Sequence, residues 1–240
     1  MFKYMCLVAC FLGSVLDTNA NAVYVVKPCK ADDKACLISS AQETVPHFTL
    51  GNEELGIPST DPLFVHEIKS KQPNLNIEFR DNVIRGASKT KIMHLERDVE
   101  KQTVKMTLGL PLHITGKYDL QGKILFLQAV GNGDYELKTN NMVFTIDAKY
   151  KVIEKKGIKH WKITGFKYTY DLVEKVHIKF DNLFGGDESK AKPINDVLNE
   201  SWREIIEEMG NPIIEPIVTA YIDVIKKWLL VMPTDKLEIV

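Results

Sequence analysis

The sequence predicts an α+β protein in which a highly curved antiparallel β-sheet wraps around one long C-terminal α-helix. Between residues 68 and 183, apolar residues alternate with polar ones between short turn signals, as in an antiparallel meander. Between residues 195 and 232, apolar residues recur at steps of three and four, which is typical of a helix with one buried face. A sheet with one apolar face must cover it, and the helix is the partner of matching length. A single thin helix leaves part of a curved sheet unfilled, so we expect an internal hydrophobic tunnel.

The N-terminal residues have the pattern of a secretory signal peptide. Lys3 precedes a short apolar run, and Ala20-Asn21-Ala22 supplies the small residues of a cleavage site. The apolar run is too short to span a bilayer. We therefore expect residues 1–22 to be removed by cleavage after Ala22, or alternatively after Ala20. Residues 23–240 are expected to form a single secreted, extracellular domain without stable membrane insertion.

Loss of the signal peptide would leave Cys29 and Cys36 out of the 4 cysteines. In an oxidising compartment, two cysteines this close in sequence are expected to form a disulfide. Half of a metal site is the alternative, but no other Cys or His lies nearby in the sequence, so we expect no metal. A ring this small stabilises the folded state by about 2–3 kcal/mol. Such a disulfide is expected to fix the first turn of the mature chain.

Before the strands, the sequence predicts a short helix and an extended connection. The helix is expected over residues 37–45, ending before Pro46. Residues 55–65 follow as an extended segment with apolar anchors and several turn signals.

Within the strand region, Gly, Asn and Asp mark the expected turns. These turns are Asp81-Asn82, Gly116, Gln121-Gly122, residues 131–134, Asn140-Asn141 and Lys156-Gly157. Residues 131–134 could also be read as a phosphate-binding loop, but no helix start follows them, which favours a hairpin turn. Residues 181–193 are expected to form an exposed crossover loop.

The helix expected over residues 195–232 would be ~57 Å long at ~1.5 Å per residue. Gly210, Pro212 and Pro216 interrupt it, and each proline removes a backbone donor. We expect a kink or a short break there. The hydrophobic pattern continues across the interruption, so the region is treated as one element.

Charge and motifs argue against several function classes. The net charge of -1 disfavours nucleic acid or an anionic membrane surface as the main partner. The sequence contains no G-x-S-x-G, H-E-x-x-H, P-loop or C-x-x-C motif, and its 6 histidines occur singly. We therefore expect no catalytic residue and no cofactor. An esterase remains a weaker alternative, since it would need a serine beside a histidine.

Apolar and aromatic residues on the inward faces are candidates for the tunnel wall. Core packing is the simpler explanation for most of them, whereas a tunnel would remain dry and accept an apolar ligand. Tyr and Trp would then offer a polar group to an ester, epoxide or quinone oxygen. The candidate tunnel residues are Trp202, Ile206, Met209, Ile213, Tyr221, Ile225, Phe79, Leu108, Phe166 and Tyr168.

Asn199-Glu200-Ser201 is an N-glycosylation sequon. A place on the polar flank of the long helix would permit a glycan on Asn199. The alternative is an unused tripeptide on a helix.

A series of motifs then resembles one known family. In order, they are C-x6-C at residues 29–36, G-I-P-x-x-D-P-L at 56–63, V-I-R-G at 83–86, L-P-L-H-I-T-G-K-Y-D-L-Q-G at 110–122, N-E-S-W-R-E-I-I-E-E at 199–208 and V-M-P at 231–233. Their order is similar to that of the insect takeout and juvenile-hormone-binding-protein family, within the tubular lipid-binding superfamily. The resemblance covers essentially the whole mature chain.

This resemblance implies a long helix wrapped by a curved sheet with an internal tunnel. It implies a secreted carrier of juvenile hormone or another elongated hydrophobic ligand of terpenoid, fatty-acid or quinone type, expected to be a monomer. Cys29 and Cys36 match the N-terminal disulfide of the family. The second disulfide of the hormone carriers has no counterpart, since no cysteine follows Cys36, and this favours the takeout branch. A signalling or interaction protein that uses the fold without a ligand is the alternative function; no particular receptor or carrier partner is indicated.

Overall fold

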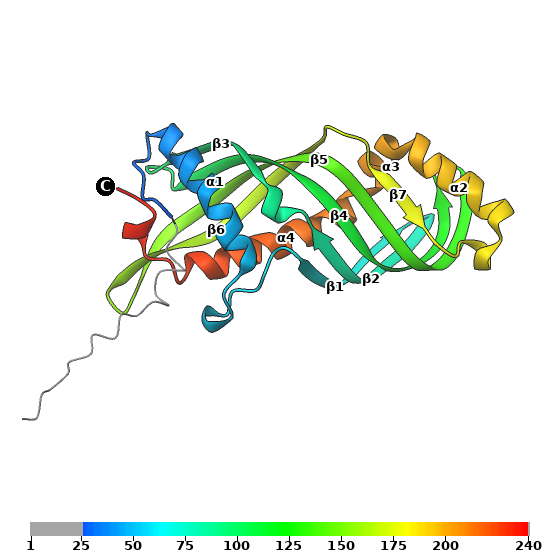
Figure 1. Cartoon of the computed structure of the whole chain (residues 1–240), viewed down its shortest axis with the longest axis horizontal. Coiled ribbons are helices and arrows are strands. Elements are labelled where there is room, and N and C mark those ends of the chain that lie inside the picture. The colour runs from blue at the N-terminus through cyan, green and yellow to red at the C-terminus, as the bar shows by residue number, and fades with distance from the viewer. Residues whose placement is uncertain (1–25, 240) are drawn as a thin grey trace, which may run out of the picture.

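The computed structural model describes residues 26–239, and the expected signal peptide lies outside the described residues. One antiparallel sheet of 7 strands curves around a C-terminal helix (Figure 1). The strands are β1 (Leu63–Gln72), β2 (Leu75–Arg85), β3 (Lys91–Asp98), β4 (Thr103–Ile124), β5 (Leu127–Lys155), β6 (Ile158–Leu172) and β7 (His177–Phe180). The α-helices are α1 (Lys34–Leu50), α2 (Glu188–Glu200), α3 (Trp202–Met209) and α4 (Asn211–Leu229).

Strands β4 and β5 form the spine of the sheet and pair with each other along the whole of β4. Their outer edges take different partners at the two ends of the molecule. The first part of β4 pairs with β3 and its second part with β2, while β5 pairs first with β7 and then with β6. The sheet therefore has two halves, joined only by the two long strands.

The change of partners on β4 occurs at a bulge around Pro111. The pairing of β4 with β5 shifts register between Leu110 and Leu112. Proline has no N–H to donate to the ladder, so a bulge is a position where a strand tolerates it. Gly86 lies against this point with φ 117°, and a Cβ on it would lie 2.0 Å from the Pro111 carbonyl oxygen. Only glycine fits there.

Several turns predicted from glycine and asparagine are wrong. Gly116, Gln121-Gly122 and residues 131–134 lie inside β4 and β5, while Asp81-Asn82 and Asn140-Asn141 fall at strand irregularities. A Cβ on Gly116 would lie 2.7 Å from the Arg80 carbonyl oxygen, so the glycine marks a close approach of two strands. The β4–β5 turn instead uses the apolar residues Leu125 and Phe126, whereas Lys156-Gly157 is a turn as predicted.

The first helix is longer than predicted. Helix α1 starts at Lys34, where the Asp33 side chain accepts a hydrogen bond from the Cys36 N–H at 3.0 Å. It continues through Pro46 and ends before Gly51, which has φ 73°.

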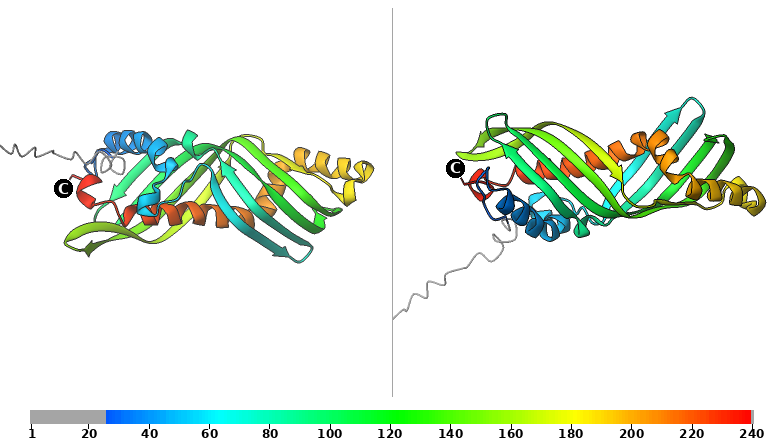
Figure 2. Two further views of the ribbon diagram at one scale, coloured as in Figure 1. Left: turned by 60° about the horizontal axis from the view of Figure 1, so that its bottom comes forward. Right: turned by 90° about the horizontal axis from the view of Figure 1, so that it is seen from above.

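The predicted single C-terminal helix is three helices. Helix α2 begins at Glu188, inside the predicted loop, and breaks at Ser201 and Gly210 separate α2, α3 and α4. Pro212 occupies the first turn of α4, a position where its missing N–H needs no helical partner. Helix α2 lies against β7 at one end, whereas α4 runs along the concave side of the sheet between β1 and β6 (Figure 2). The two helices cover different parts of the sheet, so one straight helix could not contact both parts.

The end of the molecule near β7 has a densely packed core. Phe79, Tyr118, Tyr135 and Phe180 stack there with ring centroids 4.6 Å apart for both Phe79–Tyr135 and Tyr118–Phe180. The Tyr118 hydroxyl donates to the Asp181 carbonyl oxygen, and the Tyr135 hydroxyl donates to Asn82 Oδ1. This aromatic cluster fills the concave side of the sheet at that end, whereas α4 lies between β1 and β6.

Candidate functional site

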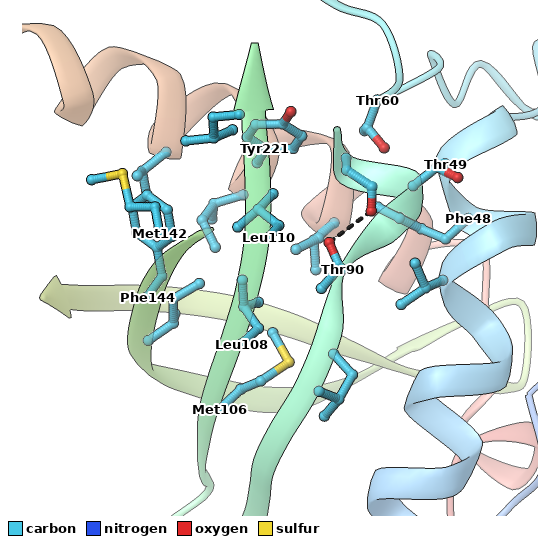
Figure 3. Close-up of a pocket in the computed structure, with 18 of the residues that line it drawn as sticks. Phe48, Thr49, Thr60, Thr90, Met106, Leu108, Leu110, Met142, Phe144 and Tyr221 are labelled. Atoms are coloured by element: carbon cyan, nitrogen blue, oxygen red, sulfur yellow. Dashed lines mark hydrogen bonds between the residues drawn. The ribbon is translucent and has the colours of Figure 1, made fainter. Parts of the chain in front are cut away.

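Beyond the aromatic cluster, the concave side of the sheet encloses an apolar cavity of about 400 Å³, within the size range of small-molecule sites (Figure 3). Its wall is built mainly from α1, β3, β4, β5, β6, α3 and α4. Strand β4 contributes every second residue, and α4 contributes one face at helical spacing. These residues are Met106, Leu108, Leu110, Leu112 and Ile114 from β4, and Ile213, Ile214, Ile217, Val218, Tyr221, Ile222, Ile225 and Trp228 from α4.

The two ends of the described chain meet at one end of the cavity. Cys29 and Leu237 both line it, and Cys29 forms the disulfide with Cys36. The Cys29 N–H donates to the Leu237 carbonyl oxygen at 3.4 Å, and the Ile239 N–H donates to the Cys29 carbonyl oxygen at 3.0 Å. Arg97 forms a salt bridge with Glu238 beneath this contact. We call the pairing of residues 29 and 237–239 the terminal clasp.

Two hydroxyl groups in the wall are buried without a hydrogen-bond partner among the described residues. They belong to Thr60, in the segment before β1, and to Tyr221 on α4. Burial, reinforced by the negative charge of Asp61, raises the pKa of Tyr221 above its ordinary value. The phenol is therefore protonated near neutral pH and can donate a hydrogen bond. Other hydroxyls in the wall are used internally; Thr90, for example, donates to the Ala87 carbonyl oxygen at 2.7 Å.

Five of the ten candidate tunnel residues lie in the wall of this cavity. They come from β4, from α3 and from α4, and are Leu108, Ile206, Ile213, Tyr221 and Ile225. Sequence regions about 100 residues apart thus meet across one apolar space.

The other five candidates lie elsewhere. Phe79 belongs to the aromatic cluster at the filled end. Trp202, Met209, Phe166 and Tyr168 are partly buried against the core but are not among the lining residues. Trp202 stacks with the Arg203 guanidinium at 4.7 Å, and the Lys226 ammonium lies 5.8 Å from the Phe166 ring centroid. Alternation identifies the inward face of a strand, but it does not tell which half of the molecule that face covers.

Helix α1 also contributes to the cavity wall, which the sequence-based prediction did not include. Leu37, Ala41, Val45 and Phe48 line the cavity from this helix, and Phe48 meets Trp228 of α4 edge to face at 5.8 Å. Their spacing of four, four and three places them on one helical face. The signal was present, but the helix was predicted to end before Phe48.

Ionisable groups in the described residues form no metal centre. No group of three or more His, Cys, Asp and Glu side chains between residues 26 and 239 could hold a metal ion. His113 is hydrogen-bonded to Glu136 at 2.7 Å, and the buried His160 contacts the Met232 carbonyl oxygen at 2.9 Å.

Between residues 26 and 239, no helix is long and apolar enough to cross a membrane.

Asn199 does not lie on the polar flank that the sequence predicts. Its Nδ2 donates to the carbonyl oxygens of Ile178 at 2.7 Å and Asn195 at 2.9 Å, and its Oδ1 accepts from the Ile178 N–H at 3.1 Å. The nitrogen that would carry a glycan is therefore directed at β7.

Known proteins share both the sequence pattern and the fold of this chain. The family model "Haemolymph juvenile hormone binding protein (JHBP)" matches residues 5–238. The circadian clock-controlled protein daywake of Drosophila melanogaster is 23% identical over 235 residues, which cover 92% of this chain and 90% of that protein. The daywake protein of Drosophila yakuba matches at the same identity and coverage.

A solved structure shows the same architecture. The crystal structure of takeout 1 from Epiphyas postvittana matches with a TM-score of 0.87 at 24% identity, covering 90% of this chain and 100% of that chain. This match confirms the predicted curved-sheet fold. Because the family model spans nearly the whole sequence, the chain belongs to the haemolymph juvenile hormone binding protein family.

Proposed function

We propose that this protein is a secreted carrier that holds an elongated hydrophobic ligand in the cavity between α1, β4 and α4. The observation that carries the proposal is the apolar cavity of about 400 Å³ within a fold that belongs to a hormone-binding family. The expected cleavage after Ala22 supports secretion. Juvenile hormone, other terpenoids, fatty acids and quinones are the ligand classes included in the proposal, and it includes no catalytic step.

The affinity would come mainly from removing apolar surface from water. A cavity lined by apolar side chains stays dry and accepts an apolar guest, so the ligand does not have to displace bound water. Burying ~300 Å² of a terpenoid at roughly 25 cal/mol per Å² would contribute about 7–8 kcal/mol before the costs of association. Even without those costs, this gain corresponds to a Kd of only about 1–10 μM, so tighter binding would require the burial of more apolar surface or polar contacts with the ligand.

The first test is recovery of a ligand from the protein itself. The full chain would be secreted from insect cells, and native mass spectrometry would be compared before and after lipid extraction. We expect a bound apolar molecule of low mass that extraction removes, and a mature N-terminus at Val23. A protein that carries no such molecule and binds none of a panel of terpenoids, fatty acids and quinones would contradict the carrier and favour an interaction protein.

A cavity-filling substitution locates the site. Leu108→Trp adds bulk inside the wall, whereas Tyr168→Trp adds bulk on the inward face of β6 outside the wall. We expect the first variant to weaken ligand binding at least tenfold, because the added ring occupies ligand volume, and the second to leave binding unchanged. Displacement of a fluorescent fatty-acid probe measures both. Equal affinities in the two variants would place the ligand elsewhere.

A further inference from the structure

The cavity wall contains two hydroxyl groups that the folded chain leaves without a partner. The Thr60 side chain is 0% exposed, and its Oγ1 has no hydrogen-bond partner among residues 26–239. The same is true of the Tyr221 hydroxyl. Buried polar groups are almost always hydrogen-bonded, and leaving one unpaired costs free energy. Two such groups in one apolar cavity point to a partner that comes from outside the chain.

Thr60 is held in place from both sides. Its N–H donates to the Thr49 carbonyl oxygen at 3.0 Å, which ties it to the end of α1. The next residue, Asp61, accepts hydrogen bonds from the N–H groups of Gly86 at 3.1 Å and Ser88 at 2.8 Å. Burial acts to raise the pKa of Asp61, but the hydrogen bonds from Ser88 and Gly86 outweigh it and lower that pKa. The hydroxyl of Thr60 therefore sits on a fixed segment.

Tyr221 reaches the same part of the cavity from the helix side. Helix α4 packs against β1, the strand that begins directly after the Thr60 segment. Figure 3 shows Thr60 and Tyr221 at one side of the cavity, with Met106 at the opposite side. Between them, the wall consists mainly of aliphatic, methionine and phenylalanine side chains, and the Thr90 hydroxyl in this stretch is already used by the Ala87 carbonyl oxygen. The wall is thus apolar over most of its area, and its unpartnered hydroxyls lie on one side. The other unpartnered polar atom of the wall among the described residues, Trp161 Nε1, belongs to a residue that lies beside Arg97 of the terminal clasp region.

We propose that Thr60 and Tyr221 form the polar end of the ligand site and bind an uncharged oxygen, such as an ester or ketone carbonyl or an epoxide, on an otherwise apolar ligand. This inference rests on the proposed carrier function and narrows its ligand class. Both groups can donate a hydrogen bond to such an oxygen. A carboxylate is disfavoured, because Asp61, the residue that follows Thr60, already places a negative charge at this part of the chain. The lysines of the wall, Lys27 and Lys138, are exposed and lie on other segments.

Three probes with the same isoprenoid skeleton test this assignment: a C15 hydrocarbon, the corresponding carboxylic acid and the methyl ester of that acid. Thr60→Val and Tyr221→Phe each remove one hydroxyl with little change of shape. We expect the wild type to prefer the ester, and each variant to weaken ester binding about three- to tenfold without changing hydrocarbon binding. Thr90→Val is the matched control, since it removes a wall hydroxyl that is already used by Ala87. That control should leave the relative affinity for ester and hydrocarbon unchanged.

Thr60→Ser keeps the hydroxyl and should bind the ester like the wild type, which separates the role of the hydroxyl from an effect on folding. Ester binding that is unchanged in both Thr60→Val and Tyr221→Phe would overturn the assignment, as would tightest binding of the free acid by the wild type. In either case, continued hydrocarbon binding would leave the carrier function intact. Failure of the wild type to bind any of the three probes would count against the carrier function for isoprenoid ligands and against this inference with it.

Discussion

At the scale of single residues, Asn195 and Asn199 take the place of a neighbouring strand beside β7. The amide of Asn199 pairs with both backbone groups of Ile178, and the amide of Asn195 pairs with both backbone groups of Phe180, at 3.4 and 3.5 Å. The two asparagines are four residues apart, so they face the same side of α2. A free strand edge invites association with other chains, and this ladder of side chains covers it.

The ladder predicts that Asn199 is a structural residue. Asn199→Ala should lower the free energy of unfolding by about 1–3 kcal/mol, because it leaves backbone groups of β7 unpaired. Urea denaturation measures the loss, and Glu200→Ala, at an exposed neighbouring position, serves as the control. We also expect the secreted protein to show no glycan mass at Asn199. A glycan there, or an unchanged stability in Asn199→Ala, would contradict this role.

At the scale of elements, the terminal clasp joins the two ends of the chain over the cavity. The Arg97 side chain is 4% exposed and its partner Glu238 is 16% exposed. The Arg97 guanidinium also lies 5.0 Å from the ring centroid of Trp161, a residue of the cavity wall. A buried charge pair of this kind holds the C-terminal segment in position, and removing one partner leaves the other charge buried and unpaired.

We therefore expect Glu238→Gln to destabilise the protein by about 3 kcal/mol. Because Leu237 and Cys29 line the cavity, we also expect faster release of a bound ligand. Guanidinium unfolding and stopped-flow release of a fluorescent lipid measure the two effects. Asp196→Asn, which breaks the exposed pair with Lys192, is the control and should cost less than about 1 kcal/mol. If both variants behaved alike, the clasp would have no special role.

At the scale of the whole molecule, one half of the sheet is filled and the other is hollow. Side chains of Phe79, Tyr118, Tyr135 and Phe180 fill the half near β7, while α1 and α4 enclose the cavity in the other. The long strands β4 and β5 connect the two halves without interruption. Stability at the filled end thus comes from the protein's own side chains, whereas the hollow end leaves contacts for a ligand to complete.

This division predicts a localised response to ligand in hydrogen exchange. A ligand that binds only the folded state stabilises it, by about 2.7 kcal/mol at a concentration 100 times its Kd. We expect added protection in residues 106–110 of β4 and in α4, and little change near Tyr118 and Phe180. Mass spectrometry of exchanged peptides with and without a bound terpenoid ester measures this. Uniform protection of both halves would contradict independent roles for the two ends.

The positions of the mistaken predictions show what local patterns encode. The sequence pattern predicts turns at Gly116 and Gly131. In the structure, Gly116 instead lets its strand approach the Arg80 carbonyl oxygen, and Gly131 lets its strand approach the Tyr118 hydroxyl. Phe79 and Leu108 both lie on inward strand faces, yet only Leu108 lines the cavity. The residue type and the period of the hydrophobic pattern carry no information about which distant segment of the chain lies opposite a given strand face.

The sequence by itself determined the class and order of the main elements and the inward faces of the strands and of α4, because the periods of two and of about 3.6 are local properties of the chain. It also determined the disulfide partners and the family. Only the tertiary structure decided where the cavity lies, because residues of β4 line the cavity from Met106 to Ile114 and then join the aromatic cluster at Tyr118, according to which distant segments lie opposite them. The lack of hydrogen-bond partners for the Thr60 and Tyr221 hydroxyls is likewise a tertiary property, because it depends on which side chains and backbone groups surround them in the fold.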